Sequence, residues 1–193
     1  MIKTQKIITL LLFLVTLLPL QNILAQDFKL NNQKSTMVVY GTSNIHDWDV
    51  NTESYEGTIS FEDASQGKID ALNITVIAES LKSGKGGMDK NTYKALKTND
   101  YENISFTLTK IGAITTKGEN SFAIQATGNL NIAGKTNTIN IEFVADIANN
   151  QVKLVGEKKI KMTDYNIDPP KALFGTITTG DEVIIKFESI FNK

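Results

Sequence analysis

The chain has 193 residues, enough for one domain with a substantial core. It has no cysteine and a single histidine, which excludes disulfide bonds and the usual Cys- and His-rich metal sites. All 20 basic residues are lysine, set against 21 acids. A slightly acidic chain without arginine lacks the planar group that grips phosphate and guanine, so we expect no nucleic-acid partner.

Residues 1–25 have the organisation of a secretory signal peptide. Lys3 and Lys6 give a positive start, an apolar run follows, and Ala25 offers a small residue for cleavage. The apolar run is shorter than the ~20 residues that a membrane-spanning helix needs. No cysteine follows it, which excludes a lipoprotein anchor. We therefore expect residues 26–193 to form one exported domain, periplasmic or secreted, without a stable membrane anchor.

Alternating apolar and polar residues predict that most of this domain is β-strand. The expected strands cover residues 37–43, 55–62, 68–81, 117–132, 136–148, 151–163 and 181–191, with a further strand from Ile104 through Leu108. Irregular structure is expected at 44–49 and 164–179, and turns at 64–67, Gly118, Gly134, 149–150 and 180–181. Roughly eight strands joined mostly by short turns predict an all-β fold, an antiparallel sheet that closes into a barrel. Such a barrel has room for side chains or for one slim ligand.

The period changes after the third strand. Residues 83–87 are rich in glycine, and residues 88–97 place apolar side chains at three- and four-residue spacings. This pattern predicts a short amphipathic helix across the barrel mouth or a sheet edge. The glycine loop lacks the spacing and the Lys-Ser/Thr ending of a phosphate-binding loop, so we interpret it as a hinge. Loop and helix together are a candidate lid over a cavity.

His46 lies in the tetrad His-Asp-Trp-Asp over residues 46–49, the one cluster with a catalytic look. A metal or acid–base site there would use His46 with Asp47 or Asp49. A zinc site needs three or four ligands, and the chain has no second histidine and no cysteine to supply them. The G-x-S-x-G motif that often carries a catalytic serine is absent from the sequence, and no pair of carboxylates stands out by its spacing. We favour a structural corner in which Trp48 plugs one barrel end and His46 makes a hydrogen bond. The sequence thus predicts a protein that is not an enzyme and has no cofactor or metal.

The lysines are scattered apart from one cluster, Lys158, Lys159 and Lys161. We interpret this cluster as a solvated strand edge that resists pairing with other sheets.

Four blocks, taken in order, carry a family resemblance. They are Gly41 to Trp48, Tyr93 to Phe106, the hairpin Thr127 to Thr136 with its G-x-L-x-I-x-G-x-T pattern, and Met162 to Pro170 followed by Gly180 to Val183. Together they resemble the YceI-like proteins, exported bacterial β-barrels described as lipid- or polyisoprenoid-binding. The resemblance implies an elongated, lipocalin-like barrel whose apolar lumen holds a long isoprenoid or acyl chain. It also implies few polar contacts and loose specificity.

The leading hypothesis is a periplasmic carrier or sequestering protein for a long apolar lipid. Its candidate lumen residues are Ile59, Phe61, Ile74, Val76, Phe106, Leu108, Leu130, Ile141, Phe143, Ile185 and Phe187, and its candidate mouth residues are Tyr93, Leu96 and Phe174. Alternation alone does not distinguish a hollow barrel from a filled one. Two alternatives therefore stay open: an envelope interaction or stress-response protein with a filled core, and a small hydrolase or isomerase that uses His46.

Overall fold

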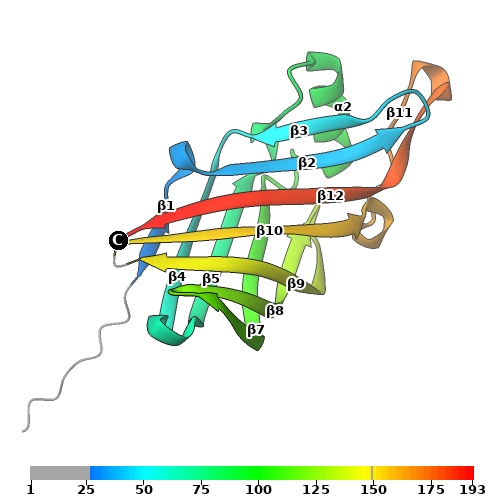
Figure 1. The fold of residues 1–193 in the computed structure, drawn as a ribbon. Coiled ribbons are helices and arrows are strands. Elements are labelled where there is room, and N and C mark those ends of the chain that lie inside the picture. The colour runs from blue at the N-terminus through cyan, green and yellow to red at the C-terminus, as the bar shows by residue number, and fades with distance from the viewer. Residues whose placement is uncertain (1–26, 149) are drawn as a thin grey trace, which may run out of the picture.

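Antiparallel strands make up most of the computed structural model, which describes residues 27–148 and 150–193 (Figure 1). The strands are β1 (Phe28–Leu30), β2 (Thr36–Ser43), β3 (Trp48–Thr52), β4 (Tyr55–Asp63), β5 (Lys68–Ile77), β6 (Leu81–Lys82), β7 (Asn103–Gly118), β8 (Ser121–Ile132), β9 (Lys135–Ala148), β10 (Gln151–Lys161), β11 (Lys171–Ala172) and β12 (Ile177–Asn192). The helix is α2 (Gly86–Leu96), and the 3-10 turns are η1 (Asn32–Lys34), η2 (Ala64–Gln66), η3 (Ala78–Ser80), η4 (Met162–Tyr165) and η5 (Leu173–Gly175). The expected signal peptide lies outside the described residues.

The barrel closes because β1 pairs with strands on both of its sides. Lys29 lies opposite Thr58 of β4 and opposite Asn192 of β12. The ring therefore runs β1-β4-β5-β7-β8-β9-β10-β12 and back to β1, and each of its pairings is antiparallel. Beyond η1, β2 continues along β12, and β3 and β6 extend the sheet. The predicted all-β, eight-stranded, lipocalin-like barrel with a short helical insertion is confirmed.

Several local predictions were wrong. The strand expected from Ile104 through Leu108 continues to Gly118 as β7, and the next strand begins at Ser121, not at residue 117. The corner at Trp48 and Asp49 is not irregular but begins β3, which pairs with β2. The third strand ends at Ile77 because η3 turns the chain, and the Ala78 backbone N–H donates to the carbonyl of Glu102 (2.9 Å). Gly180 and Asp181 lie within β12, not in a turn.

Close approach explains the glycine in β12. The register of β12 against β2 shifts between Thr179 and Val183, so this part of the strand is irregular. A Cβ at Gly180 would lie 2.4 Å from the hydroxyl oxygen of Thr42. The sequence signal for a turn was therefore a signal for contact between two strands.

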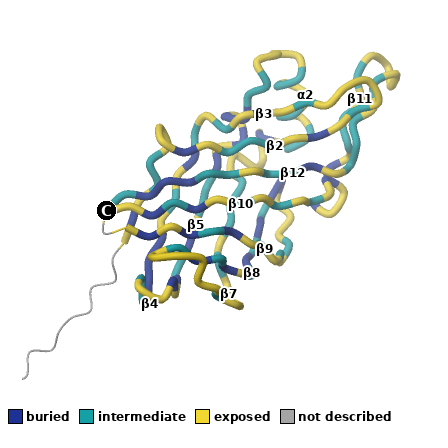
Figure 2. The backbone as a smooth tube through the Cα atoms, in the orientation of Figure 1, coloured by how far each residue is buried: buried dark blue, intermediate teal, exposed yellow. Residues whose placement is uncertain are grey.

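Among the described residues, the barrel interior holds two apolar clusters, and Phe106 packs against both. The larger one fills the end that carries β1 and the C-terminus, and Phe28, Ile59 and Phe191 are completely enclosed in it. The second cluster lies at the opposite end, and Met162, Tyr165 and Val183 are among its buried members. Figure 2 shows buried and exposed stretches alternating along the strands, as a two-faced sheet requires.

Within the described residues, no helix is both long and apolar enough to span a lipid bilayer.

Candidate functional site

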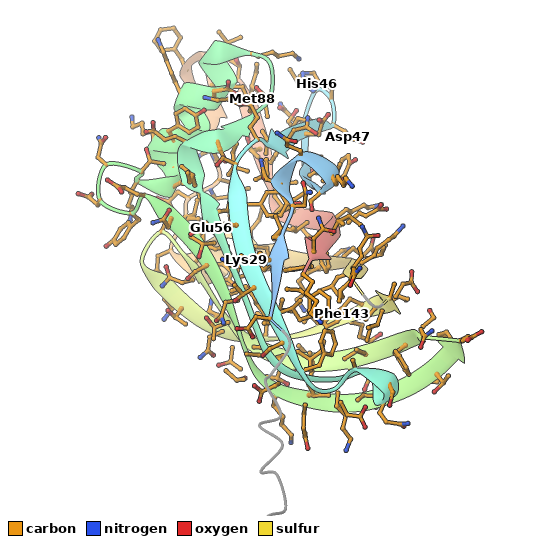
Figure 3. The ribbon with its side chains drawn as sticks, turned by 90° about the vertical axis from the view of Figure 1, so that its left-hand side faces the viewer. Lys29, His46, Asp47, Glu56, Met88 and Phe143 are labelled. Atoms are coloured by element: carbon orange, nitrogen blue, oxygen red, sulfur yellow. The ribbon has the colours of Figure 1, made fainter. Side chains whose placement is uncertain are left out.

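The barrel is hollow at the end where α2 lies. A cavity of about 480 Å³ occupies this end, within the range of about 300–1,000 Å³ found for small-molecule sites. Its walls come mainly from β2, β3, β12, η4 and α2, and β5, β6, β7, β8, β10 and β11 each add one or two residues. In Figure 3, His46 and Met88 lie at this end, and Phe143 lies toward the other end of the barrel.

Strand register turns apolar side chains toward this space. Val39 of β2 pairs with Ile185 of β12 on one side and with Val50 of β3 on the other, and all three line the cavity. Paired residues in an antiparallel sheet share a face, so the alternation of β2 and β12 produces one continuous apolar wall.

A second, smaller cavity of about 110 Å³ continues the lumen inward. Met37, Val76, Ile104 and Ile185 line both cavities. The far side of the smaller cavity is made by residues of the filled cluster, including Phe143. The lumen therefore runs from the α2 end to the middle of the barrel and stops on a solid core. The barrel is neither wholly hollow nor wholly filled.

The structure divides the fourteen candidate residues among three environments. Val76 and Ile185 line both cavities, Leu96 lines the larger one, and Ile74, Phe106, Leu130, Ile141, Phe143 and Phe187 line the smaller one. Ile59 and Phe61 are buried within the filled cluster, and Leu108 packs against it. Tyr93 and Phe174 line neither cavity. The sequence therefore predicted that the strand residues among these candidates face the barrel interior. It did not predict whether each one lies beside a cavity or in the filled end of the barrel.

Sequence reasoning missed much of the cavity wall. The additional apolar lining includes Met37, Val39, Val50, Met88, Ile104, Ile132, Ile160, Met162, Ile167 and Val183. Methionine was a usable signal, because Met37, Met88 and Met162 are the chain's methionines after Met1 and all three line the larger cavity. Methionine is flexible and polarisable, and it is common on surfaces that adapt to several ligands.

Helix α2 is tied down at both ends. The Tyr93 hydroxyl lies 2.9 Å from the carbonyl oxygen of Glu79, and it accepts a hydrogen bond from the Lys82 ammonium (2.6 Å). At the start of the helix, the Asp89 carboxylate accepts from the backbone N–H (2.8 Å) and the hydroxyl (2.6 Å) of Ser83. These hydrogen bonds hold the pKa of Asp89 below its usual value. Tyr93, a candidate mouth residue, serves in this arrangement to anchor the helix.

The His-Asp-Trp corner forms part of the cavity wall. The Trp48 ring packs on Gly41, where a Cβ would lie 2.1 Å from the ring, and its Nε1 donates to the Thr42 carbonyl (2.9 Å). His46 is exposed, and its Nδ1 lies 2.7 Å from the Asp47 carbonyl oxygen. Within residues 27–148 and 150–193, His46 belongs to no group of three or more possible metal ligands.

The β11 hairpin borders the cavity mouth. Lys171 and Ala172 line the larger cavity, and the next two residues, Leu173 and Phe174, are strongly exposed, with Phe174 entirely in solvent. Both have positive φ angles, 48° and 57°. The left-handed region costs a non-glycine residue roughly 1–2 kcal/mol, so an exposed apolar pair held there is a costly arrangement.

Two side chains with buried hydroxyl groups, Tyr165 and Thr52, lie in the wall of the larger cavity. Burial raises the pKa of Tyr165, so its phenol stays neutral at physiological pH. The Thr52 hydroxyl is also buried, without a hydrogen-bond partner among the described residues. A neutral phenol and a hydroxyl in an apolar wall can each form a hydrogen bond with a ligand.

Comparison with known proteins agrees with this architecture. The YceI-like domain family matches residues 28–191. Burkholderia cenocepacia BcnA has the same fold, with a TM-score of 0.68 and 19% identity over 83% of this chain and 98% of that one. A polyisoprenoid binding domain from Saccharophagus degradans, implicated in plant cell wall breakdown, also has this fold. Its TM-score is 0.68 and its sequence identity is 12%, and the match covers 86% of this chain and 97% of that one. For a YCEI protein from Campylobacter jejuni, the TM-score is 0.61 and the sequence identity is 20%, and the match covers 75% of this chain and 84% of that one.

No curated protein matches this chain in sequence. The solved structures share its fold at low identity, and the family match covers nearly the whole barrel, from β1 into β12. On that match, the chain belongs to the YceI-like domain family.

Proposed function

We propose that this protein binds a long apolar lipid, an isoprenoid or a fatty acyl chain, in the hollow end of the barrel and carries or sequesters it without catalysis. The observation that carries the proposal is the tapering lumen of about 480 Å³ and about 110 Å³ beneath α2. Each methylene moved from water into such a lumen contributes about 0.8 kcal/mol. Ten methylenes therefore supply about 8 kcal/mol before the cost of immobilising the chain.

Two further observations support a lipid with variable chain shape. A solved structure of the same fold is a polyisoprenoid binding domain, and that chain is matched over 97% of its length. The three methionines of the wall can change conformation at little cost, which suits chains that differ in branching. The expected signal peptide places the carrier in the periplasm or outside the cell, where free lipid needs a protein host.

The exposed tip of the β11 hairpin favours one alternative. Leu173 and Phe174 at the mouth suit a partner that docks on the rim, as in an envelope interaction or stress-response protein. This alternative predicts that the purified protein contains no lipid and takes none up.

The test uses protein purified without detergent, so that a bound lipid is not displaced. The exported chain is expressed in a bacterial envelope, purified, denatured and extracted, and the extract is analysed by mass spectrometry. We expect about one isoprenoid or acyl lipid per chain. A clean extract, together with no uptake of added lipids, would overturn the proposal and favour the rim-docking alternative.

A matched pair of variants shows whether the lumen is the binding site. Val39→Trp places an indole in the larger cavity, whereas Val38→Trp places the same group on the outer face of the same strand. We expect the Val39 variant to lose bound lipid and the Val38 variant to keep it. Equal lipid content in two folded variants would show that the lipid lies elsewhere.

A further inference from the structure

Lys158 is a charged residue on the inner face of the barrel wall. It pairs across β10 and β12 with Ile185, which lines both cavities, so its side chain belongs to the same face. Lys158 lines the smaller cavity and is half-buried. The neighbouring lysines, Lys159 and Lys161, occupy the opposite face. The lysine cluster of the sequence is thus divided by the strand period into one inward and two outward residues.

Nothing in the described chain neutralises this inward charge. Three ion pairs join β10 and β12 on the outer face: Lys153–Glu188 (3.3 Å), Lys159–Glu182 (2.9 Å) and Lys186–Glu157 (3.5 Å). No carboxylate of residues 27–148 and 150–193 lies within ion-pair distance of the Lys158 ammonium. The other charged residues that line the two cavities are also lysines, Lys85 and Lys171. The chain has 21 acids, and its lumen lining in the described residues includes none.

The barrel wall changes at the position of Lys158. Pairing between β9 and β10 ends at Glu142 and Glu157, and from Lys158 onward β10 pairs with β12 alone. Figure 1 shows β9 and β10 diverging toward the end of the barrel where α2 lies. Lysine side chains bury their methylenes and keep the ammonium hydrated where water is within reach. With its stem on the lumen wall, the Lys158 ammonium is hydrated from the lumen side, by water in the smaller cavity.

Filling the lumen removes this option unless the ligand replaces the water. A purely apolar chain in the smaller cavity displaces the water around the ammonium and offers no hydrogen bond in its place, so the charge is desolvated at a large cost in free energy. An anionic group at the same place forms a charge-assisted hydrogen bond. Lys158 therefore discriminates between chains of equal length by the charge of the head.

We propose that Lys158 makes this barrel selective for lipids with an anionic head, a carboxylate or a phosphate monoester. The head lies in the smaller cavity of about 110 Å³, and the chain runs through the larger cavity of about 480 Å³ toward α2. This inference rests on the proposed lipid-binding function and defines the chemical class of the ligand. Ser189, 2% exposed, also lines the smaller cavity.

Matched amphiphiles test the head group. Dodecanoate, dodecyl phosphate and dodecanol are titrated into delipidated protein by calorimetry at neutral pH, below their aggregation concentrations. We expect each anion to bind tenfold or more tightly than the alcohol. Lys158→Met, which keeps the stem volume, should remove this preference, and Lys158→Arg should keep it. Lys161→Met, a loss of the same charge on the outer face, should leave the preference unchanged.

The outcomes separate the inference from the function beneath it. If no amphiphile binds, the proposed function fails. If anions and alcohol bind equally, or if Lys158→Met leaves the preference intact, lipid binding stands and the role of Lys158 is overturned. A preference for only one of the two anions identifies the head as carboxylate or phosphate.

The orientation of the chain has its own readout. Trp48 is the single tryptophan, and it lines the larger cavity. Bromine quenches a nearby indole, so ω-bromododecanoate should quench Trp48 fluorescence more strongly than α-bromododecanoate. The reverse order would place the head at the mouth, beside Lys85 and Lys171, and would overturn the assignment to Lys158.

Discussion

Replacing Ile59 by alanine should cost far more folding stability than the same change at Ile185. Ile59 is fully enclosed in the filled cluster, whereas Ile185 lines both cavities. Each change removes three carbons from the middle of a strand, so differences in β propensity largely cancel. At Ile59 the lost transfer free energy is about 2.4 kcal/mol, and the new void brings the total to about 3–4 kcal/mol. At Ile185 the space opposite is already empty, so the loss is about 1 kcal/mol.

Urea unfolding of the lipid-free protein measures the difference. With a denaturant dependence of about 2 kcal/mol/M, the midpoint should fall by about 1.5–2 M for the Ile59 variant and by about 0.5 M for the Ile185 variant. Lipid must be absent because a ligand that binds only the folded state adds to its apparent stability. Equal losses would refute the assignment of the two residues to a filled and a hollow end.

Three other changes have defined outcomes. Gly156→Ala should lower the unfolding free energy by about 2 kcal/mol, because its Cβ would lie 2.9 Å from a backbone oxygen of β9; Gly86→Ala, in open space on α2, should cost nothing. Asp181→Asn should lower the unfolding free energy at pH 7, because hydrogen bonds from Thr163 hold the pKa of Asp181 below its usual value. The difference in unfolding free energy between variant and wild type should disappear as the pH falls below about 4 and through that lowered pKa. A difference that stays constant with pH would contradict this cause. Phe174→Asn should leave the unfolding midpoint equal or higher, because asparagine adopts the left-handed backbone conformation of this position at less cost than phenylalanine. The same variant should take up lipid from vesicles more slowly. An unchanged uptake rate would contradict the placement of Phe174 at the cavity mouth.

Local periodicity accounts for what the sequence could predict of the fold. The alternation in β4 and the three- and four-residue spacing in α2 placed both elements to within two residues of their observed bounds. β1 has only three residues, too few to show a period, yet its pairings close the barrel. Closure by so short a strand depends on partners far along the chain, which no local pattern reports.

The candidate site was predictable in direction but not in depth. Alternation correctly assigned Ile59 and Ile185 to the inner face, but one is in solid core and the other on a cavity wall. Whether space remains opposite a side chain depends on the size of residues from the other side of the barrel. The inward position of Lys158 was hidden for a different reason: polarity suggested solvent, and only the register with Ile185 shows the face that it occupies.

The filled end of this barrel has an evolutionary consequence. Phe28, Ile59 and Phe191 pack in a filled cluster, whereas the partly buried wall residues near α2 face a cavity, so substitutions in that part of the wall cost less folding stability. A lineage can then change the lining of its cavity by drift at one end of the barrel while selection conserves the other end. Directed evolution toward binding of a chosen hydrophobic compound should therefore randomise partly buried wall positions such as Val39, Met88 and Ile160 and leave the closed end untouched.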